Sequence, residues 1–326
     1  MQNSYQINRL QQILIIILIV QIGLMVIVFW PQTASSQTGG PLLAEVVPDE
    51  VVELTLSDSA GQSINLTKKN NSWVMSDADD YPVIGENVTT LLEKIEGVNT
   101  NRLITKTDAS HDRLQVADDN FNRRLDLTLA DGSTHALFIG SSGGASAAHV
   151  RAAGRDEVYL TSELAAFDAN TQAASWVDTL YFSLPQTGTV SITLENENGR
   201  FSFNQVNESW TLAGLTGDEL FNQNTFSTML NQISAVRLTE PVGTEPEDSF
   251  GMDNPTATVR IETADETFTL NLGSQDPSDN SYILKASNSP YYVKVAQFTG
   301  SNLADKSRAD FLQPTPEADG VISPSE

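Results

Sequence analysis

The sequence predicts an α+β fold: an N-terminal transmembrane helix followed by two tandem homologous modules, each a mostly antiparallel sheet packed by one main helix. Three observations lead to this prediction. They are an apolar run near the N-terminus, an internal repeat, and strand patterns that gather around one helical pattern in each copy. Strands grouped around a single helix, without regular alternation of strands and helices, are typical of antiparallel α+β folds. The length of 326 residues also fits about two domains.

The internal repeat begins with a predicted β-hairpin. The segment VVELTLSDSAGQSINLTKKNNSW at residues 51–73 returns as TVSITLENENGRFSFNQVNESW at residues 189–210. Apolar and polar residues alternate on both sides of a glycine-containing turn, which is the period of a half-buried strand. Trp73 and Trp210 end the two copies. We expect both rings in the core instead of in a ligand groove, because an aromatic ring beside a hairpin usually fills the space between sheet and helix.

Each copy continues with one amphipathic helix and further strands. Apolar residues recur at helical spacing in ENVTTLLEKIEGV, residues 86–98, and in NTFSTMLNQISAV, residues 224–236. The apolar positions agree between the copies while the polar ones differ, as expected for a helix that packs on a sheet. Strand pairs are predicted at residues 124–129 with 136–139 and at residues 258–263 with 267–272.

The predicted domain organisation has six parts. They are a cytoplasmic tail at residues 1–12, a transmembrane anchor at 13–30, a flexible linker at 31–50, a first module at 51–185, a second module at 189–312 and a disordered tail at 313–326. The linker prediction depends on its Pro, Gly, Ser and Thr content.

The apolar run ILIIILIVQIGLMVIVFW at residues 13–30 is long enough for a helix to cross a bilayer. The alternative is a cleaved signal peptide, with Ala34, Ser35 and Ser36 as small residues at the cleavage site, although signal peptides usually have a shorter apolar region. Arg9 precedes the run and the next cation is Lys68. The positive-inside rule therefore predicts a single-pass protein of the cell membrane with a cytoplasmic N-terminus and an extracytoplasmic bulk.

Composition excludes several classes of function. The formal net charge is −24, from 42 acidic and 18 basic residues, and such a surface repels the phosphate backbone of nucleic acids. The sequence has no cysteine, which excludes disulfides, thiolate metal sites, cysteine nucleophiles and lipoprotein acylation. We therefore expect no nucleic-acid partner.

One motif resembles a catalytic site. Gly140-Ser141-Ser142-Gly143-Gly144 matches the G-x-S-x-G pattern of a nucleophile elbow. That elbow requires a strand followed by a helix on a parallel sheet, whereas the residues after Gly144 predict another antiparallel strand. We therefore interpret the motif as a loop and expect no catalytic residue.

The candidate metal ligands are scattered. His111, His135 and His149 fall in different predicted elements, so we expect surface histidines. The acidic turns at residues 77–80 and 276–279 lack the spacing of a calcium loop. Neither a GxxxxGK[ST] nor a GxGxxG phosphate-binding loop occurs. The sequence thus predicts no metal site and no cofactor.

The order of these elements resembles the bacterial family known as domain of unknown function 4340, here in tandem copies. The resemblance depends on the hairpin, the tryptophan strand, the LLxxI-type helix and a glycine element, which Phe250-Gly251-Met252 with Pro255 fits in the second copy. In the first copy Leu114-Gln115-Val116 lacks the glycine, and Asn120 stands in place of the proline. The resemblance implies an envelope-associated protein, often found with gliding-type ABC transport components, with no established catalytic residues.

The expected function is therefore a membrane-anchored, non-enzymatic interaction or scaffold protein of the cell envelope, accessory to an ABC-type transport or gliding-type complex. Its expected partners are the membrane, through the N-terminal helix, and envelope proteins. The alternative is an extracytoplasmic module that binds a glycan or peptide at the cleft between the repeats. A hydrolase that uses Ser142 is the third possibility.

Overall fold

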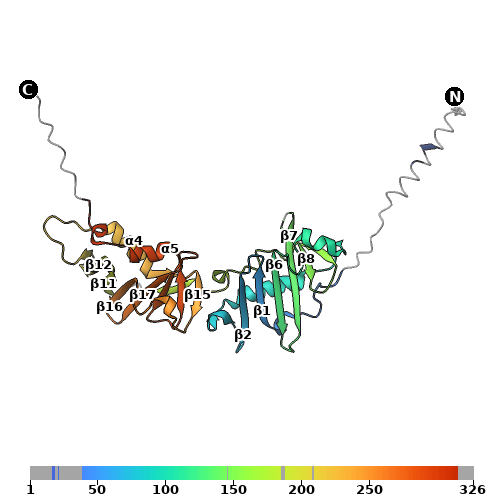
Figure 1. The fold of residues 1–326 in the computed structure, drawn as a ribbon, viewed down its shortest axis with the longest axis horizontal. Coiled ribbons are helices and arrows are strands. Elements are labelled where there is room, and N and C mark those ends of the chain that lie inside the picture. Colours follow the sequence, from blue (N-terminus) through green and yellow to red (C-terminus); the bar gives the residue numbers. More distant parts are fainter. Residues whose placement is uncertain are drawn as a thin grey trace, which may run out of the picture.

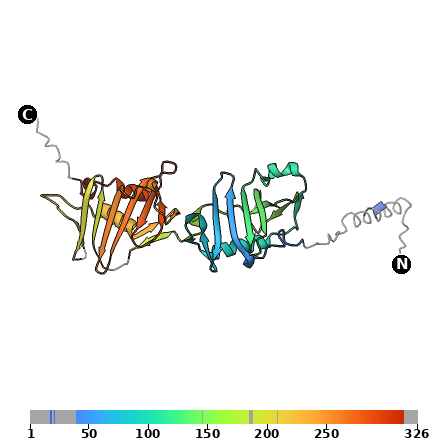
Figure 2. The ribbon, with the colours of Figure 1, turned by 60° about the horizontal axis from the view of Figure 1, so that its bottom comes forward.

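The computed structural model describes residues 17–18, 21, 39–144, 146–184, 188–207 and 209–314. Over these ranges the fold is α+β and rich in antiparallel sheet, with few helices, as the strand patterns predicted. Figures 1 and 2 show two large sheets that lie end to end along the long axis of the molecule.

The first sheet contains nine strands in the order β4-β3-β2-β1-β6-β7-β8-β9-β5. The strands are β1 (Val51–Asp58), β2 (Ser63–Lys69), β3 (Ser72–Met75), β4 (Tyr81–Pro82), β5 (Leu103–Thr105), β6 (Arg123–Leu129), β7 (Thr134–Gly144), β8 (Ala147–Ala152) and β9 (Val158–Thr161). The helices of this half are η1 (Pro48–Glu50), η2 (Ser76–Ala78), α2 (Gly85–Gly97), η3 (Asp108–Ser110), α3 (His111–Leu114) and η4 (Ala173–Ser175). Helix α2 buries its apolar stripe: Val88, Leu91, Leu92 and Ile95.

The second sheet contains eight strands in the order β13-β12-β11-β16-β17-β18-β19-β15. The strands are β11 (Thr189–Asn196), β12 (Gly199–Val206), β13 (Ser209–Leu212), β15 (Glu240–Gly243), β16 (Ala257–Thr263), β17 (Thr267–Gln275), β18 (Tyr282–Ala286) and β19 (Tyr292–Val295). The helices are α4 (Gln223–Ser234), η5 (Asp248–Phe250), α5 (Gln297–Ala304) and η6 (Arg308–Phe311). Helix α4 buries Phe226, Met229 and Ile233.

Both predicted hairpins and both main helices are confirmed, with one change of register. A β-bulge lies between Val51 and Glu53 in β1, and another between Thr189 and Ser191 in β11. Because a bulge adds one residue to the strand, the alternation shifts at the start of β1, where Val51 is fully buried and Val52 only half-buried.

The two repeated tryptophans are buried to different degrees. Trp73 is buried in the main core, as predicted. Trp210 is half-buried and packs on Phe226 with a ring-centroid distance of 5.0 Å.

The prediction of a flexible linker at residues 31–50 was wrong for residues 39–50. Leu42, Leu43 and Val46 are buried in the core. The Leu42 N–H donates to Val98 O at 2.7 Å, so this segment pairs with the residues that follow α2. Turn-forming composition predicted flexibility, but three apolar side chains and a backbone pairing decide the structure. Residues 31–38 lie outside the described residues.

The last residues of the predicted first module, 51–185, pair and pack with the second half of the chain. Strand β10 (Leu180–Ser183) pairs with β14 (Ala235–Arg237), which follows α4. The helix predicted to extend to Val236 ends at Ser234, because Val236 lies in β14. Phe182 packs edge to face on Phe268 of the second sheet, with the ring centroids 5.5 Å apart. Residues 180–184 thus belong with the second sheet.

Of the predicted transmembrane anchor, the structure describes Ile17, Leu18 and Gln21 alone, all helical and exposed. No helix in the described part of the chain is long and apolar enough to cross a membrane. The predicted tail at residues 1–12 lies outside the described residues. Of the disordered tail predicted at 313–326, residues 315–326 lie outside them, whereas Gln313 N donates to Leu220 O at 2.8 Å.

Candidate functional site

The two sheets meet where β15, the edge strand of the second sheet, faces η2 of the first (Figure 1). The residue after η2 is Asp79, whose backbone adopts a left-handed conformation with φ of 50°. Its carboxylate accepts hydrogen bonds from Thr244 N at 2.7 Å and from Thr244 Oγ1 at 3.0 Å. The hydrogen bond from the Thr244 N–H is the main cause that holds the pKa of Asp79 below its ordinary value. One side chain of the first sheet therefore caps the edge of the second.

Three tyrosines fill the junction beside this cap. The rings of Tyr81 and Tyr291 pack edge to face with their centroids 4.7 Å apart, and the Tyr291 hydroxyl donates to Asp80 O at 3.3 Å. The Tyr181 hydroxyl donates to Tyr291 O at 2.6 Å. Burial raises the pKa of Tyr81 to about 12. Apolar ring contact and hydrogen bonding thus act together across the junction.

A cavity of about 630 Å³ opens at the same junction. Its lining comes from both sheets and from the segment around η4: Gln62, Ser63, Ile64, Met75, Asp77, Ala78, Thr171–Ala174, Leu238–Pro241 and Asp279. The floor is apolar, because Ile64, Met75 and Leu238 are each only 3% exposed. The wall carries hydroxyl, amide and carboxylate groups. This combination of an apolar floor and several polar groups is typical of a small-ligand site.

The charged side of the cavity is organised by Lys294 of β19. Its ammonium lies 3.0 Å from Asp276, 3.5 Å from Asp279 and 3.7 Å from Glu240. Hydrogen bonds from Ser278, followed by the bond from Lys294, hold the pKa of Asp276 well below its ordinary range. Asp279 and Glu240 border the cavity, and Lys294 balances part of their charge from behind the lining.

The candidate nucleophile Ser142 has no catalytic partner among the described residues. It is exposed, its hydroxyl lies 3.4 Å from Ala147 O, and it accepts from Gly144 N at 3.2 Å. The nearby histidine, His149, contacts Ser141 instead, with Nδ1 3.2 Å from Ser141 Oγ. The motif forms the end of strand β7 and pairs with β8 as an antiparallel hairpin, so the loop interpretation was wrong, although the antiparallel strand predicted after the motif is present.

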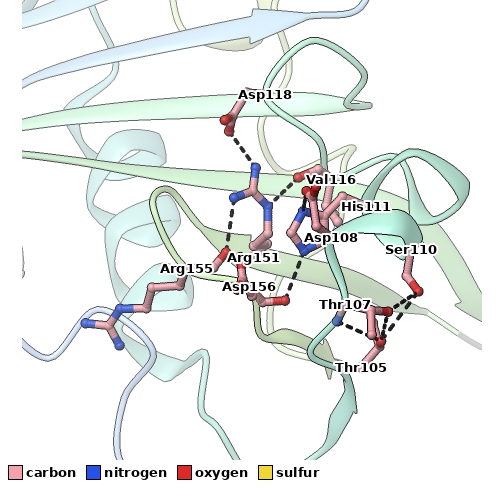
Figure 3. Close-up of polar contacts among 10 residues, drawn as sticks. All are labelled: Thr105, Thr107, Asp108, Ser110, His111, Val116, Asp118, Arg151, Arg155 and Asp156. Atoms are coloured by element: carbon pink, nitrogen blue, oxygen red, sulfur yellow. Dashed lines mark hydrogen bonds and ion pairs between the residues drawn. The ribbon is translucent and has the colours of Figure 1, made fainter.

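His111 was wrongly predicted to be a surface histidine. It is only 4% exposed, its Nε2 lies 2.9 Å from Asp156 O, and its Nδ1 lies 3.3 Å from Asp108 Oδ1 (Figure 3). The neighbouring Arg151 is equally buried and donates to Val116 O and to Asp118 Oδ1, each at 2.6 Å. These contacts hold the turn at residues 108–118 against the sheet.

The remaining acidic and histidine candidates do not converge. Asp77 accepts hydrogen bonds from Asn65, while Asp79 and Asp80 point to Thr244 and Lys69. His135 and His149 lie in β7 and β8, apart from His111 in α3. Within the described ranges no group of three or more His, Asp or Glu is placed to hold a metal ion.

Sequence reasoning missed the junction tyrosines. Tyr81, Tyr181 and Tyr291 have no place among the predicted sites, because the repeat identifies residues that both copies share. A usable signal was present. When the strand registers are matched, Tyr291 corresponds to Glu157, so the two copies do not share this residue. Residues that one copy alone contains are the ones available for a contact between copies.

Comparison with known proteins gives one family match. The profile described as Domain of unknown function (DUF4340) matches residues 73–249. This single match begins in β3 of the first sheet and ends in η5 beside the second, so it does not show two tandem family domains. No curated protein and no solved structure matches the chain. Because the match covers more than half of the sequence, the chain belongs to the DUF4340 family.

Proposed function

We propose that the chain contains the same α+β unit twice. The strand orders support this: β3-β2-β1-β6-β7-β8-β9-β5 in the first sheet has the same sequence of connections as β13-β12-β11-β16-β17-β18-β19-β15 in the second. The β-bulges support it too. Strands β1 and β11 each have a bulge near their start, and strands β7 and β17 each have a bulge that includes a glycine, Gly140 or Gly273. Bulges are specific local features, so two matching pairs favour a common origin over chance.

The segments that precede each unit are also equivalent. Leu42 N donates to Val98 O, and Thr100 N donates to Gly40 O. In the second half, Leu184 N donates to Ser234 O, and Leu238 N donates to Thr179 O. In both halves, therefore, a lead-in segment pairs with the chain just after the main helix. We therefore propose that the first unit starts near residue 39 and the second near residue 178.

We propose that the protein is a membrane-anchored, extracytoplasmic, non-enzymatic interaction protein of the cell envelope, accessory to an ABC-type transport or gliding-type complex. The observation that favours it is the junction. The Asp79–Thr244 cap and the contacts of Tyr291 with Tyr81 and Asp80 join the two sheets, which supports a body whose surfaces keep a fixed separation. The apolar run at residues 13–30 and the position of Arg9 support the anchor and its orientation.

Two experiments test this function. The full chain should remain with membranes after a carbonate wash, and its recovery in the aqueous fraction would contradict the anchor. In intact cells, crosslinking of the wild-type chain should then recover the same envelope transport subunits in every preparation. The Asp79→Ala variant should lose partners that require both sheets, whereas a partner held by one sheet would survive. Neighbouring genes for an ABC ATPase and permease would favour the transport role.

A second function is favoured by the junction cavity: capture of a glycan or peptide between the units. The volume of the cavity, its apolar floor and its polar wall support this second function. A ligand at about 100 times its dissociation constant should stabilise the fold by about 2.7 kcal/mol. Screening glycans and peptides by melting temperature would detect that gain. The Glu240→Gln variant should weaken it, while Glu247→Gln, outside the lining, serves as the matched control. Equal responses of both variants would argue against the cavity.

A further inference from the structure

We propose that a second cavity, beside the end of the β7–β8 hairpin, binds a single aromatic ring: the ring of a small phenol or of a tyrosine side chain. This cavity has a volume of about 400 Å³, and all of its lining residues lie between residues 122 and 167. It shares no lining residue with the junction cavity. The inference therefore goes beyond the proposed function, because it adds a site on the first sheet and the class of ligand that this site would take.

The lining of this ring cavity is mostly apolar. The small apolar side chains come from β8 and from the segment that follows β9: Ala147, Ala148, Ala165 and Ala166. The ring of Phe167 also lines the cavity and is 73% exposed. Asn122 and Ser142 add an amide and a hydroxyl that can bond to a phenol. Ligand pockets usually have volumes of about 300–1,000 Å³, so a cavity at the small end of this range suits one ring.

The second sheet fills the equivalent position with a tyrosine of its own. Ser142 pairs with Ala148 after a register shift in the β7–β8 hairpin, and Gln275 pairs with Tyr282 after a register shift in the β17–β18 hairpin. Ala148 and Tyr282 are therefore equivalent positions, and both are buried in the main core. The first sheet has a methyl group where the second has a phenol ring.

The segments that cover these two positions also correspond. Helix α5 follows β19, and Gly300 of α5 lies so close to the Tyr282 ring that a Cβ on Gly300 would collide with it. In the first half, residues 163–170 follow β9, and Ala166 stands as far from the end of β9 as Gly300 stands from the end of β19. Corresponding segments thus enclose a phenol ring in one half and a cavity in the other, which makes an aromatic ring the occupant that the cavity fits.

Polar contacts fix the segment that covers the ring cavity. Lys94 Nζ donates to Asp168 Oδ1 at 2.5 Å, and Asp168 Oδ2 accepts from Ala165 N at 2.8 Å. Arg123 Nε donates to Ala169 O at 3.0 Å. A wall that is already ordered lowers the entropic cost of binding, which matters most for a ligand as small as one ring.

Titration with p-cresol, the analogue of a tyrosine side chain, tests the proposal directly. The full-length protein in detergent is labelled at its alanine methyl groups and observed by NMR. We expect saturable shifts of the Ala148 and Ala166 methyl signals, with millimolar affinity because the ligand is so small. The apolar alcohol n-hexanol, which has no ring, should bind more weakly. The absence of saturable shifts with p-cresol, or equal binding of the two compounds, would overturn the proposal.

Two substitutions should remove the site. Ala148→Tyr places in the cavity the ring that the second half already has, and Ala166→Leu fills it from the covering segment, so each should abolish the shifts. Ala130→Leu, in an exposed turn, is the control and should bind p-cresol as the wild type does. Ala166 is half-buried, so Ala166→Leu still gives an answer if Ala148→Tyr does not fold. Binding retained by Ala166→Leu would place the ligand elsewhere and contradict the proposal.

The exposed ring beside the cavity gives a graded readout. Phe167→Ala should weaken p-cresol binding by about two- to tenfold, which is the usual contribution of one aromatic pair. Phe298→Ala is the matched control, because Phe298 is 68% exposed on α5 of the other half. Equal effects of the two variants would rule out this cavity as the binding site.

The reverse substitution tests the equivalence of the two halves. Tyr282→Ala should open the counterpart cavity beneath Gly300, so p-cresol should restore part of the melting temperature that this variant loses. Rescue of Tyr282→Ala without any binding to the wild type would overturn the proposal.

The source of the ring is identified by comparing the tripeptides Gly-Tyr-Gly and Gly-Ala-Gly with p-cresol. Binding of Gly-Tyr-Gly at least as tight as that of p-cresol would support the site and assign the ring to a partner protein. Binding of p-cresol with rejection of both tripeptides would support the site and assign the ring to a free phenol.

Discussion

Two equivalent turns, one on each sheet, are held in place by different chemistry. Each turn lies over a glycine of a long strand. Residues 114–116 lie over Gly140 of β7, and residues 250–252 lie over Gly273 of β17. A methyl group on either glycine would collide with a carbonyl oxygen of the overlying turn, that of Leu114 or that of Phe250. The close approach of the two backbones is therefore the shared feature.

The side chains that fasten the turns differ. In the first sheet Arg151 is buried beneath the turn, with its guanidinium 4.6 Å from the centroid of Phe138. In the second sheet Lys285 takes the equivalent strand position, is half-buried, and lies 4.3 Å from the centroid of Tyr292. Burial lowers the pKa of the Lys285 ammonium. A cation over an aromatic ring is thus kept, while the full polar network of Arg151 and His111 occurs on one sheet alone.

Backbone geometry therefore constrains the two halves more tightly than side-chain chemistry does. The first half also tolerates the missing turn glycine. Gln115 adopts the left-handed conformation with φ of 58°, where Gly251 has φ of 67°. The departure from the family pattern in the sequence therefore changed the residue and left the turn intact.

The largest effect should come from the buried cation. Arg151→Met leaves Val116 O and Arg155 O without their donor, and a buried acceptor left unsatisfied costs about 1–3 kcal/mol, whereas the Asp118 carboxylate is 77% exposed and can bind water instead. Urea unfolding monitored by circular dichroism measures the loss. The matched control Lys285→Met should cost less than about 1 kcal/mol, because this side chain is half-exposed. Similar losses in both variants would remove the difference between the halves.

The two hairpin glycines should respond alike. Gly140→Ala and Gly273→Ala each force the turn away from the sheet, and we expect each to cost about 1–3 kcal/mol, as overpacking does. Thermal unfolding measures both values. The control Gly132→Ala meets no neighbouring atom, so it reports the cost of its positive φ alone. A large loss for Gly140→Ala with none for Gly273→Ala would contradict the equivalence of the turns.

Substitutions that exchange the two turn residues should change the free energy of unfolding in opposite directions. Gly251→Ala places a Cβ in the left-handed region and should cost about 1–2 kcal/mol. Gln115→Gly removes the same strain but adds freedom to the unfolded chain, so the expected gain is below about 1 kcal/mol. Denaturant midpoints measure the pair. Destabilisation by Gln115→Gly would show that its side chain holds the turn.

The smallest effect concerns the contact between the halves. The pKa of Asp79 is held below its ordinary value of 3.8, so its contribution to the junction is complete above about pH 4 and is lost as the pH falls through the lowered pKa. Small-angle scattering of the wild type should therefore show a looser joint in acid. Asp79→Asn keeps an acceptor oxygen but cannot titrate, so its profile should be flat over that range. A profile like that of the wild type would assign the change to other carboxylates.

Short-range patterns predicted much of this fold. Alternation predicted the hairpin of β1 and β2, and helical spacing predicted α2 and α4, because the backbone geometry of strands and helices places residues two, or three to four, apart on one face. The same patterns placed His111, His135 and His149 in different elements, but they did not predict that Ser142 lies in a strand or that His111 is buried. The junction could not be predicted, since Asp79 and Thr244 are 165 residues apart and nothing local in either turn requires the other.

By itself, the sequence determined the sheet-rich α+β class, the two hairpins, the two main helices and the acidic, cysteine-free character of the surface, all of which follow from local periodicity and composition. The tertiary structure alone decided that residues 39–50 join the core and that His111 and Arg151 are buried. It also decided that β15 is capped by Asp79 and that a cavity opens beside that cap. The physical reason is that burial and hydrogen bonding depend on which distant segments meet. Polar residues, which carry no periodic signal, acquire their roles from those meetings.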